Sequence, residues 1–151
     1  MNLHAKPTNL MKTLLISFFL LFCTILSFGQ CDKEVKLTTS KTEYLDAAGV
    51  VQRTVDEQST IDIGKTDILI IPGNADQKMI GIIQSTTCTW SVPYKEGKTV
   101  MKALFKEPSG EERHVTLTIE GKAGQLTFLM EIAEMPDRKI RVWVEEFGEK
   151  K

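Results

Sequence analysis

Three short runs near the C-terminus, each with an apolar residue at every second position, constrain the fold more than any other part of the sequence. They are 115–119, 126–132 and 140–144. Since successive side chains of a β-strand point to opposite faces of the sheet, this spacing predicts strands with one dry and one wet face. The connectors 120–124 and 134–138 carry the Gly and Pro that favour turns. The sequence therefore predicts an antiparallel meander whose apolar face is covered by the rest of the chain.

The residues between Lys33 and Lys106 continue this pattern, with short alternating runs interrupted by Gly, Pro, Asn and Asp. No segment after residue 31 carries a convincing apolar period of 3.6 residues, which a helix packed on a core would need. We therefore expect an all-β protein of about eight to ten short strands. Either an antiparallel sandwich or a small barrel, lipocalin-like and partly open, fits this layout.

Local patterns lead to more specific expectations for this region. In the opening strand the residues 35, 37 and 39 form the apolar row, which places Thr42 and Tyr44 on the opposite face. The mixed segment 50–55 is expected to be a solvent-facing or edge strand. Gly81, in the middle of an apolar run, is expected to mark a bulge or a bend.

The first 30 residues have the layout of a secretory signal peptide. Lys12 precedes the apolar run 14–28, which is followed by Gly29 and Gln30. The run is shorter than the roughly 20 residues that span a bilayer as a helix. We expect a signal-peptide helix over 1–30, a true translation start at Met11, and a single exported domain over 31–151. That domain would be periplasmic or extracellular, with no stable membrane anchor after cleavage.

The charge of the predicted domain argues against two classes of partner. Without Lys6 and Lys12 it keeps 17 basic and 20 acidic residues, a net charge of about −3. A nucleic-acid-binding protein needs a concentrated basic stripe, and a membrane-surface protein needs a polybasic segment. Neither pattern is present in the sequence, so we expect no nucleic-acid partner.

Cysteine usage is consistent with export. Cys23 leaves with the signal peptide, which leaves Cys31 and Cys88 as an even pair. A bridge between them would close a loop of about 57 residues and stabilise the fold by about 3–4 kcal/mol. The alternative is that Cys88 is a small buried hydrophobic residue and Cys31 belongs to a loose terminus.

Residues that could carry out catalysis are few. His114 is the histidine that remains after cleavage, and no second His or Cys stands at metal-ligand spacing from it. We therefore expect a surface histidine on a strand, no metal and no cofactor. Carboxylates are plentiful, but only folding can bring two of them to the separation that a glycosidase needs.

Trp143 is the strongest candidate for a contact with a ligand or partner. Its neighbours Val142 and Val144 belong to the apolar row, so Trp143 shares the polar face with Arg141. An exposed aromatic residue is a frequent anchor of interfaces, whereas Lys or Arg stems that cover the ring would make it structural. Tyr94, in the loop 93–97, is a second candidate.

Taken together, the Phe28-Gly-Gln30 signal end, the Thr42-x-Tyr44 opening strand, the Asp46-x-x-Gly49 turn and the closing meander resemble small exported all-β proteins of Gram-negative bacteria. Those proteins have no assigned function, so the resemblance implies no catalytic residue. The function expected from the sequence is binding, either of a small apolar ligand or of an envelope protein. The alternatives are a cell-envelope hydrolase with a carboxylate pair and a structural component of the envelope.

Overall fold

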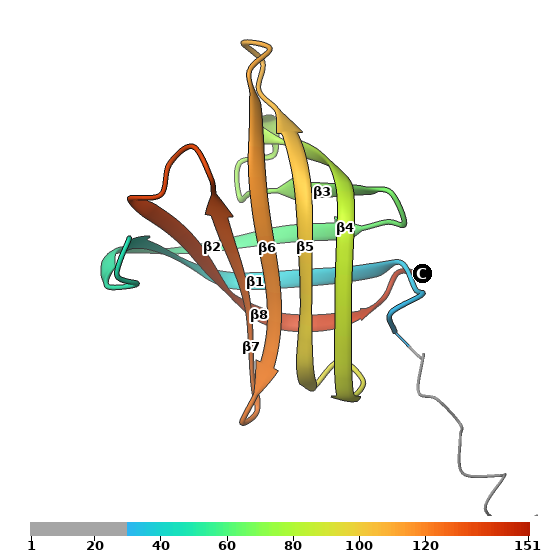
Figure 1. Ribbon diagram of the computed structural model, residues 1–151. Coiled ribbons are helices and arrows are strands. Elements are labelled where there is room, and N and C mark those ends of the chain that lie inside the picture. Colours follow the sequence, from blue (N-terminus) through green and yellow to red (C-terminus); the bar gives the residue numbers. More distant parts are fainter. Residues whose placement is uncertain (1–29) are drawn as a thin grey trace, which may run out of the picture.

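Eight antiparallel strands close into one barrel in the computed structural model, which describes residues 30–151 (Figure 1). Each strand pairs with the next along the chain, and β8 returns to pair with β1. The all-β prediction is confirmed, and of the two architectures the barrel is the one formed. The strands are β1 (Val35–Asp46), β2 (Val51–Ile63), β3 (Asp67–Ile71), β4 (Met79–Val92), β5 (Glu96–Lys106), β6 (Glu112–Lys122), β7 (Gln125–Ile132) and β8 (Arg138–Glu149).

The strand β8 closes the barrel along the whole length of β1. The pairing runs from Val35 opposite Glu149 to Asp46 opposite Arg138, and the amide of Lys150 donates to the carbonyl of Glu34 at 2.8 Å. Every strand among the described residues thus has two neighbours, but β3 is short, so the residues 51–59 of β2 pair only with β1 and the residues 85–92 of β4 pair only with β5.

The segment 50–55 is solvent-facing, as expected, and its residues from Val51 on form the first half of β2. This half pairs with β1 on one side and has no strand on the other, because β3 pairs with β2 only over the residues 60–63. It is therefore locally an edge, as the sequence predicted.

Inward-facing apolar rows from all eight strands fill the barrel. An eight-stranded barrel has an interior just wide enough to be filled by side chains or to hold one small ligand. Leu37, Ile61, Ile68, Leu117 and Ile119 are at most 1% exposed and occupy its middle. The Lys-bearing rows face water, as the alternation predicts.

A shift of register in β1 changes which side chains point inward. The register of β1 against β8 shifts between Thr38 and Thr39 and again between Thr39 and Lys41. The register of β1 against β2 also shifts between Thr39 and Lys41. Because one extra residue reverses the alternation, Thr42 and Tyr44 point into the barrel. The prediction that they lie opposite the row 35–39 was therefore wrong.

Gly81 is not the site of a bulge. It pairs in regular register with Ile68 and Phe105, and the register shift of β4 comes later, between Ile83 and Ser85. A Cβ atom on Gly81 would lie 2.6 Å from the ring of Phe105. The glycine makes room for that ring in the core.

One end of the barrel is partly covered by the start of the described chain and by the β4–β5 turn, which leave a cavity of about 260 Å³ open to solvent there. Cys31 is joined to Cys88 of β4 by a disulfide, with 5.8 Å between the Cα atoms. Gln30 is buried, and its side-chain oxygen accepts a hydrogen bond from the amide of Tyr94. We call residues 30–34, with this disulfide, the N-terminal stopper.

The proposed start at Met11 and the residues 1–29 of the predicted signal peptide and its helix lie outside the described residues, whereas Gln30, the last residue of that prediction, is described and is buried. Within 30–151 no helix is long and apolar enough to cross a membrane. The short 3-10 turn η1 (Ala75–Gln77) belongs to the β3–β4 loop.

Candidate binding cavity

A cavity of about 290 Å³, partly open to solvent, lies inside the barrel below the β3–β4 loop, away from the N-terminal stopper. We call it the mouth cavity. Strands β1, β2, β3, β7 and β8 supply most of its wall, and the β3–β4 loop with η1 and the first residue of β4 supply the rest. The lining residues are Thr42, Tyr44, Glu57, Ser59, Ile61, Ile70, Pro72, Asn74, Gln77, Met79, Phe128, Met130, Ile140 and Val142.

The wall of the mouth cavity is mostly apolar because it is built from the inward rows of the strands. Ile61 and Ile70 come from β2 and β3, and Phe128 and Val142 from β7 and β8. These residues are buried, with 7% exposure at most. They continue the packed middle of the barrel, which forms the floor of the cavity.

A few polar groups are placed on this apolar wall by the register shift in β1. The hydroxyl of Thr42 donates to Oε1 of Glu57 at 3.3 Å. Thr42 is buried and Glu57 is half-buried. The β3–β4 loop crosses close above, because a Cβ atom on Gly73 would lie 3.3 Å from Cβ of Glu57 and 3.5 Å from its Oε2. Glu57 therefore presents a carboxylate inside the cavity.

At the rim, Arg53 lies over the ring of Tyr44, with 4.2 Å from the guanidinium carbon to the ring centroid. This cation–π contact covers the outer edge of the cavity. Asn74 caps η1 by accepting from the amide of Asp76 at 3.1 Å. Both contacts order the entrance.

Trp143, the strongest candidate from the sequence, lies on the outer face of the barrel and does not line the cavity. It pairs with Lys41 of β1, whose ammonium lies 4.8 Å from the ring centroid, and Arg141 lies 5.5 Å from the same ring. The ring is therefore flanked by two cations, as expected if basic side chains cover it. Its indole nitrogen is buried and reaches no acceptor at hydrogen-bond geometry.

Arg141 also holds Glu43, whose side chain is only 9% exposed although it belongs to the outer face. The Arg141 Nε donates to Oε2 of Glu43 at 2.8 Å, and Nζ of Lys41 lies 3.5 Å from Oε1. Burial acts to raise the pKa of Glu43, but the hydrogen bond from Arg141, the nearby indole of Trp143 and the two positive charges outweigh it. The pKa therefore lies below its ordinary value.

Replacing Arg141 by Met is expected to lower the free energy of unfolding by about 1–3 kcal/mol at pH 7, because a buried carboxylate loses its main partner. A carboxyl group with a lowered pKa in the folded state adds stability above its unfolded pKa, which is lost as the pH falls through the folded value. The deficit of Arg141→Met, measured by urea unfolding, should therefore shrink as the pH falls below 4.5, the ordinary pKa of the carboxyl group. Arg138→Met, which breaks an exposed pair with Asp137, is the control and should change stability little. A deficit independent of pH would contradict this assignment.

Tyr94, the second candidate from the sequence, lies beside the N-terminal stopper, where its amide donates to Gln30. Its ring stands edge-on to Phe147 with 5.0 Å between centroids, and Phe147 in turn lies 5.5 Å from Trp90. Burial raises the pKa of the Tyr94 hydroxyl above its ordinary value. Of the sequence candidates, Trp143 and Arg141 thus lie together on the outer face, Tyr94 lies apart from them, and none of the three lines the mouth cavity.

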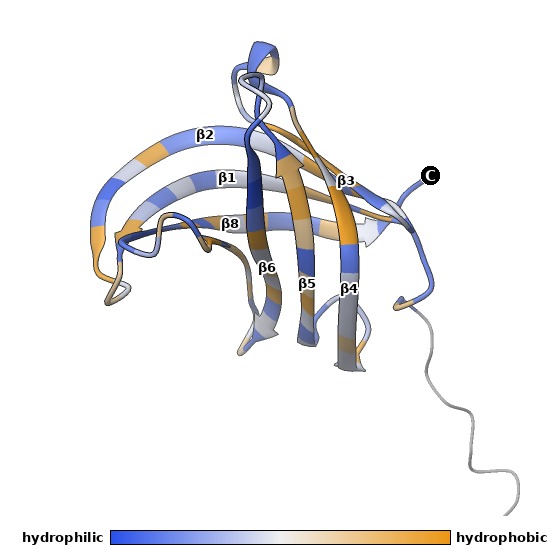
Figure 2. Ribbon diagram, turned by 45° about the horizontal axis from the view of Figure 1, so that its top comes forward, coloured by the Kyte–Doolittle hydropathy of each residue, from blue (hydrophilic) through white to orange (hydrophobic). Residues whose placement is uncertain are grey.

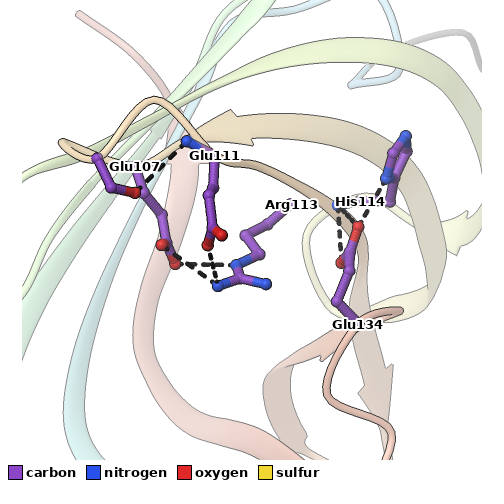
Figure 3. Close-up of polar contacts among 6 residues, drawn as sticks. Glu107, Glu111, Arg113, His114 and Glu134 are labelled. Carbon is purple, nitrogen blue, oxygen red and sulfur yellow. Dashed lines mark hydrogen bonds and ion pairs between the residues drawn. The ribbon is translucent and has the colours of Figure 1, made fainter.

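Two exposed groups of ionic contacts tie down the loops beside β6 (Figure 3). Arg113 contacts Glu107 at 3.0 Å and Glu111 at 2.8 Å across the β5–β6 turn. Nδ1 of His114 lies 2.7 Å from Glu134, whose carboxylate also accepts from the His114 amide. These contacts lower the pKa of Glu134 to about 2. His114 is therefore a surface histidine that anchors the β7–β8 loop.

Comparison with known proteins adds no assignment. No family model, curated protein or solved structure matches this chain. The arguments about function therefore depend on the geometry of the barrel itself.

The described residues contain no group of three or more His, Cys, Asp or Glu that could hold a metal ion. Of the residues that line the mouth cavity, Glu57 is the one with a carboxylate. A hydrolytic mechanism with paired carboxylates therefore finds no second acid on this wall.

Apolar residues are frequent where β3, β4 and β5 lie side by side (Figure 2), and some of their side chains face solvent. Ile80 and Ile82 are 61% and 58% exposed. Leu69 lies opposite Ile80 and Leu104 opposite Ile82. We call these four residues the outer patch. Contiguous exposed apolar surface of this kind marks interaction sites more often than isolated exposed residues do.

Proposed function

We propose that the protein binds a small, mostly apolar ligand in the mouth cavity. The observation that carries the proposal is a closed barrel with an apolar-walled cavity of about 290 Å³ at one end. Ligand sites are typically concave and apolar, with a few polar groups that fix orientation, and they measure roughly 300–1,000 Å³. The cavity lies near the lower end of that range, which favours a compact ligand.

Two further features support the proposal. The mouth cavity opens beside the β3–β4 loop, and the N-terminal stopper lies away from this opening, beside a second, less apolar cavity of about 260 Å³, so a ligand of the mouth cavity would enter and leave beside the loop. The disulfide is typical of proteins that work in an oxidising compartment. This supports the proposal that the protein is exported and meets its ligand in the periplasm or outside the cell.

Docking of a protein partner is the second candidate function, favoured by the outer patch. Its residues Ile80 and Ile82 are more exposed than large apolar side chains usually are on a monomer surface. Native mass spectrometry of protein purified from its own compartment separates the two. A copurifying mass of a few hundred daltons supports the cavity, and a copurifying protein supports the patch.

Filling the cavity should abolish ligand binding. Ile140 lines the cavity and is only partly buried, so the side chain of Ile140→Trp can extend into the empty space. We expect binding of a hydrophobic fluorescent probe to weaken by at least tenfold, measured by titration, because the cavity volume is occupied. Thr118→Trp, which places the same ring on the outer face of β6, is the matched control and should bind as the wild type does. Equal binding by both variants would contradict a site in this cavity.

A further inference from the structure

We infer that the ligand of the mouth cavity carries a protonated amine, and that Glu57 recognises it. The inference rests on the proposed function, because it names the chemical class of ligand for the same cavity. It starts from the carboxylate of Glu57, which belongs to the wall of a mostly apolar cavity.

The carboxylate of Glu57 lacks a cation partner in the described chain. No Lys, Arg or His lies within ion-pair distance of it there, and its one side-chain hydrogen bond comes from the neutral hydroxyl of Thr42. Glu57 is half-buried, and its oxygens are not among the buried polar atoms that lack a partner, so water reaches the carboxylate in the empty cavity. A ligand that fills the cavity displaces this water, and a charge that loses water costs free energy unless an opposite charge and hydrogen bonds replace it. A bound ammonium group would supply both the charge and the donors.

The basic residues nearest the cavity in sequence do not neutralise Glu57. Arg53 precedes it by four residues on β2, which is about 13 Å along a strand, and its guanidinium lies on the ring of Tyr44. Lys78 is exposed and is not among the lining residues, although its neighbours Gln77 and Met79 are. An anionic ligand such as a carboxylate would therefore meet a like charge with no cation on the wall.

The rest of the wall also suits a cation attached to an apolar group. Phe128 contributes an aromatic ring, and the face of such a ring attracts ammonium groups, whereas the ring of Tyr44 is already covered by Arg53. Ile61, Ile70 and Val142 provide the apolar surface for the remainder of the ligand. The wall thus fits a small amphiphilic amine better than a neutral or acidic molecule of the same shape.

The test uses three probes of one shape: 4-phenylbutylamine, 4-phenylbutanol and 4-phenylbutyrate. Isothermal titration calorimetry at pH 7.5 should give a dissociation constant for the amine about tenfold or more below that of the alcohol, as a charge-assisted hydrogen bond provides. The butyrate should bind most weakly. In Glu57→Gln the amine should bind no better than the alcohol, because the carboxylate has been replaced by a neutral amide of similar shape.

Asp56→Asn is the matched control for this variant. Asp56 precedes Glu57 but pairs with Lys41 on the outer face, so its loss should leave the preference for the amine unchanged. Equal binding of amine and alcohol to the wild type, with no effect of Glu57→Gln, would overturn the inference while the cavity remained a ligand site. Failure of all three probes to bind would overturn the proposed function together with it.

Discussion

Replacing Cys31 and Cys88 together by Ser is expected to lower the free energy of unfolding by about 3–4 kcal/mol. The bridge joins residues 57 apart, and a cross-link of that span reduces the conformational entropy of the unfolded chain by about this amount. The folded barrel keeps its strand pairing without the bridge. Cys88 remains paired with β5, and Gln30, next to Cys31, keeps its hydrogen bonds with Tyr94 and Lys33. The loss should therefore appear as a lower urea midpoint with a largely unchanged cooperative transition.

The same substitution should loosen the N-terminal stopper more than the rest of the barrel. Gln30 is held by the disulfide next to it, by the amide of Tyr94 and by a backbone bond from Lys33 to its carbonyl at 3.1 Å. Hydrogen exchange in residues 30–34 should become faster in the double variant. Reductant should produce the same changes in the wild type and none in the variant. If the free energy of unfolding falls by less than about 0.5 kcal/mol, the disulfide does not stabilise the fold as described.

The alternation of apolar residues predicted much of the barrel because it is local information. The row of Met101, Ala103 and Phe105 faces inward and Lys102 faces water, as expected. The C-terminal meander forms as predicted, with its two short turns. Each of these features depends only on which neighbouring side chains prefer to leave water.

The mouth cavity could not be predicted, because it depends on register rather than on residue type. Thr42 and Tyr44 point inward only because the pairing of β1 slips near Thr39. Glu57 shares the inward row of β2 with Ser59 and Ile61, but its residue type and its neighbour Asp56 suggested a solvated charge, and the sequence did not show that a cavity lies beside it. A bulge adds one residue to one strand, and nothing in the local sequence distinguished it from regular extended chain.

For Trp143 the sequence predicted the face of the sheet on which the side chain lies, but its role as a ligand or partner contact remains a proposal. The alternation placed it on the polar face with Arg141, and the structure does so. The two cations that flank its ring come from different strands, one of them β1, about a hundred residues earlier in the chain. Such a contact follows from closure of the barrel, which the sequence did not reveal.

Replacing Gly121 by Ala is expected to destabilise the protein by about 3 kcal/mol, because the added methyl group meets backbone rather than a movable side chain. Its Cβ atom would lie 2.2 Å from the carbonyl oxygen of Lys95 and 2.8 Å from that residue's carbonyl carbon. Gly121 of β6 lies opposite Gly97 of β5, and a Cβ atom on Gly97 would lie 2.5 Å from the carbonyl oxygen of Thr89. Because neither of these facing glycines has a side chain, the backbone of the β4–β5 turn can pack directly against β6 beside the N-terminal stopper.

Relief of this clash requires the turn to move, and the turn carries Tyr94, which packs on Phe147 and binds Gln30 of the N-terminal stopper. Urea unfolding of Gly121→Ala should therefore show the lower midpoint, and the near-ultraviolet circular dichroism of the aromatic cluster should change with it. Gly148→Ala is the matched control, since a Cβ atom there meets nothing within 4 Å and its backbone requires no positive φ. That variant should be neutral or slightly more stable, because alanine restricts the unfolded chain more than glycine does. Equal stability of the two variants would show that the turn does not close over Gly121 as described.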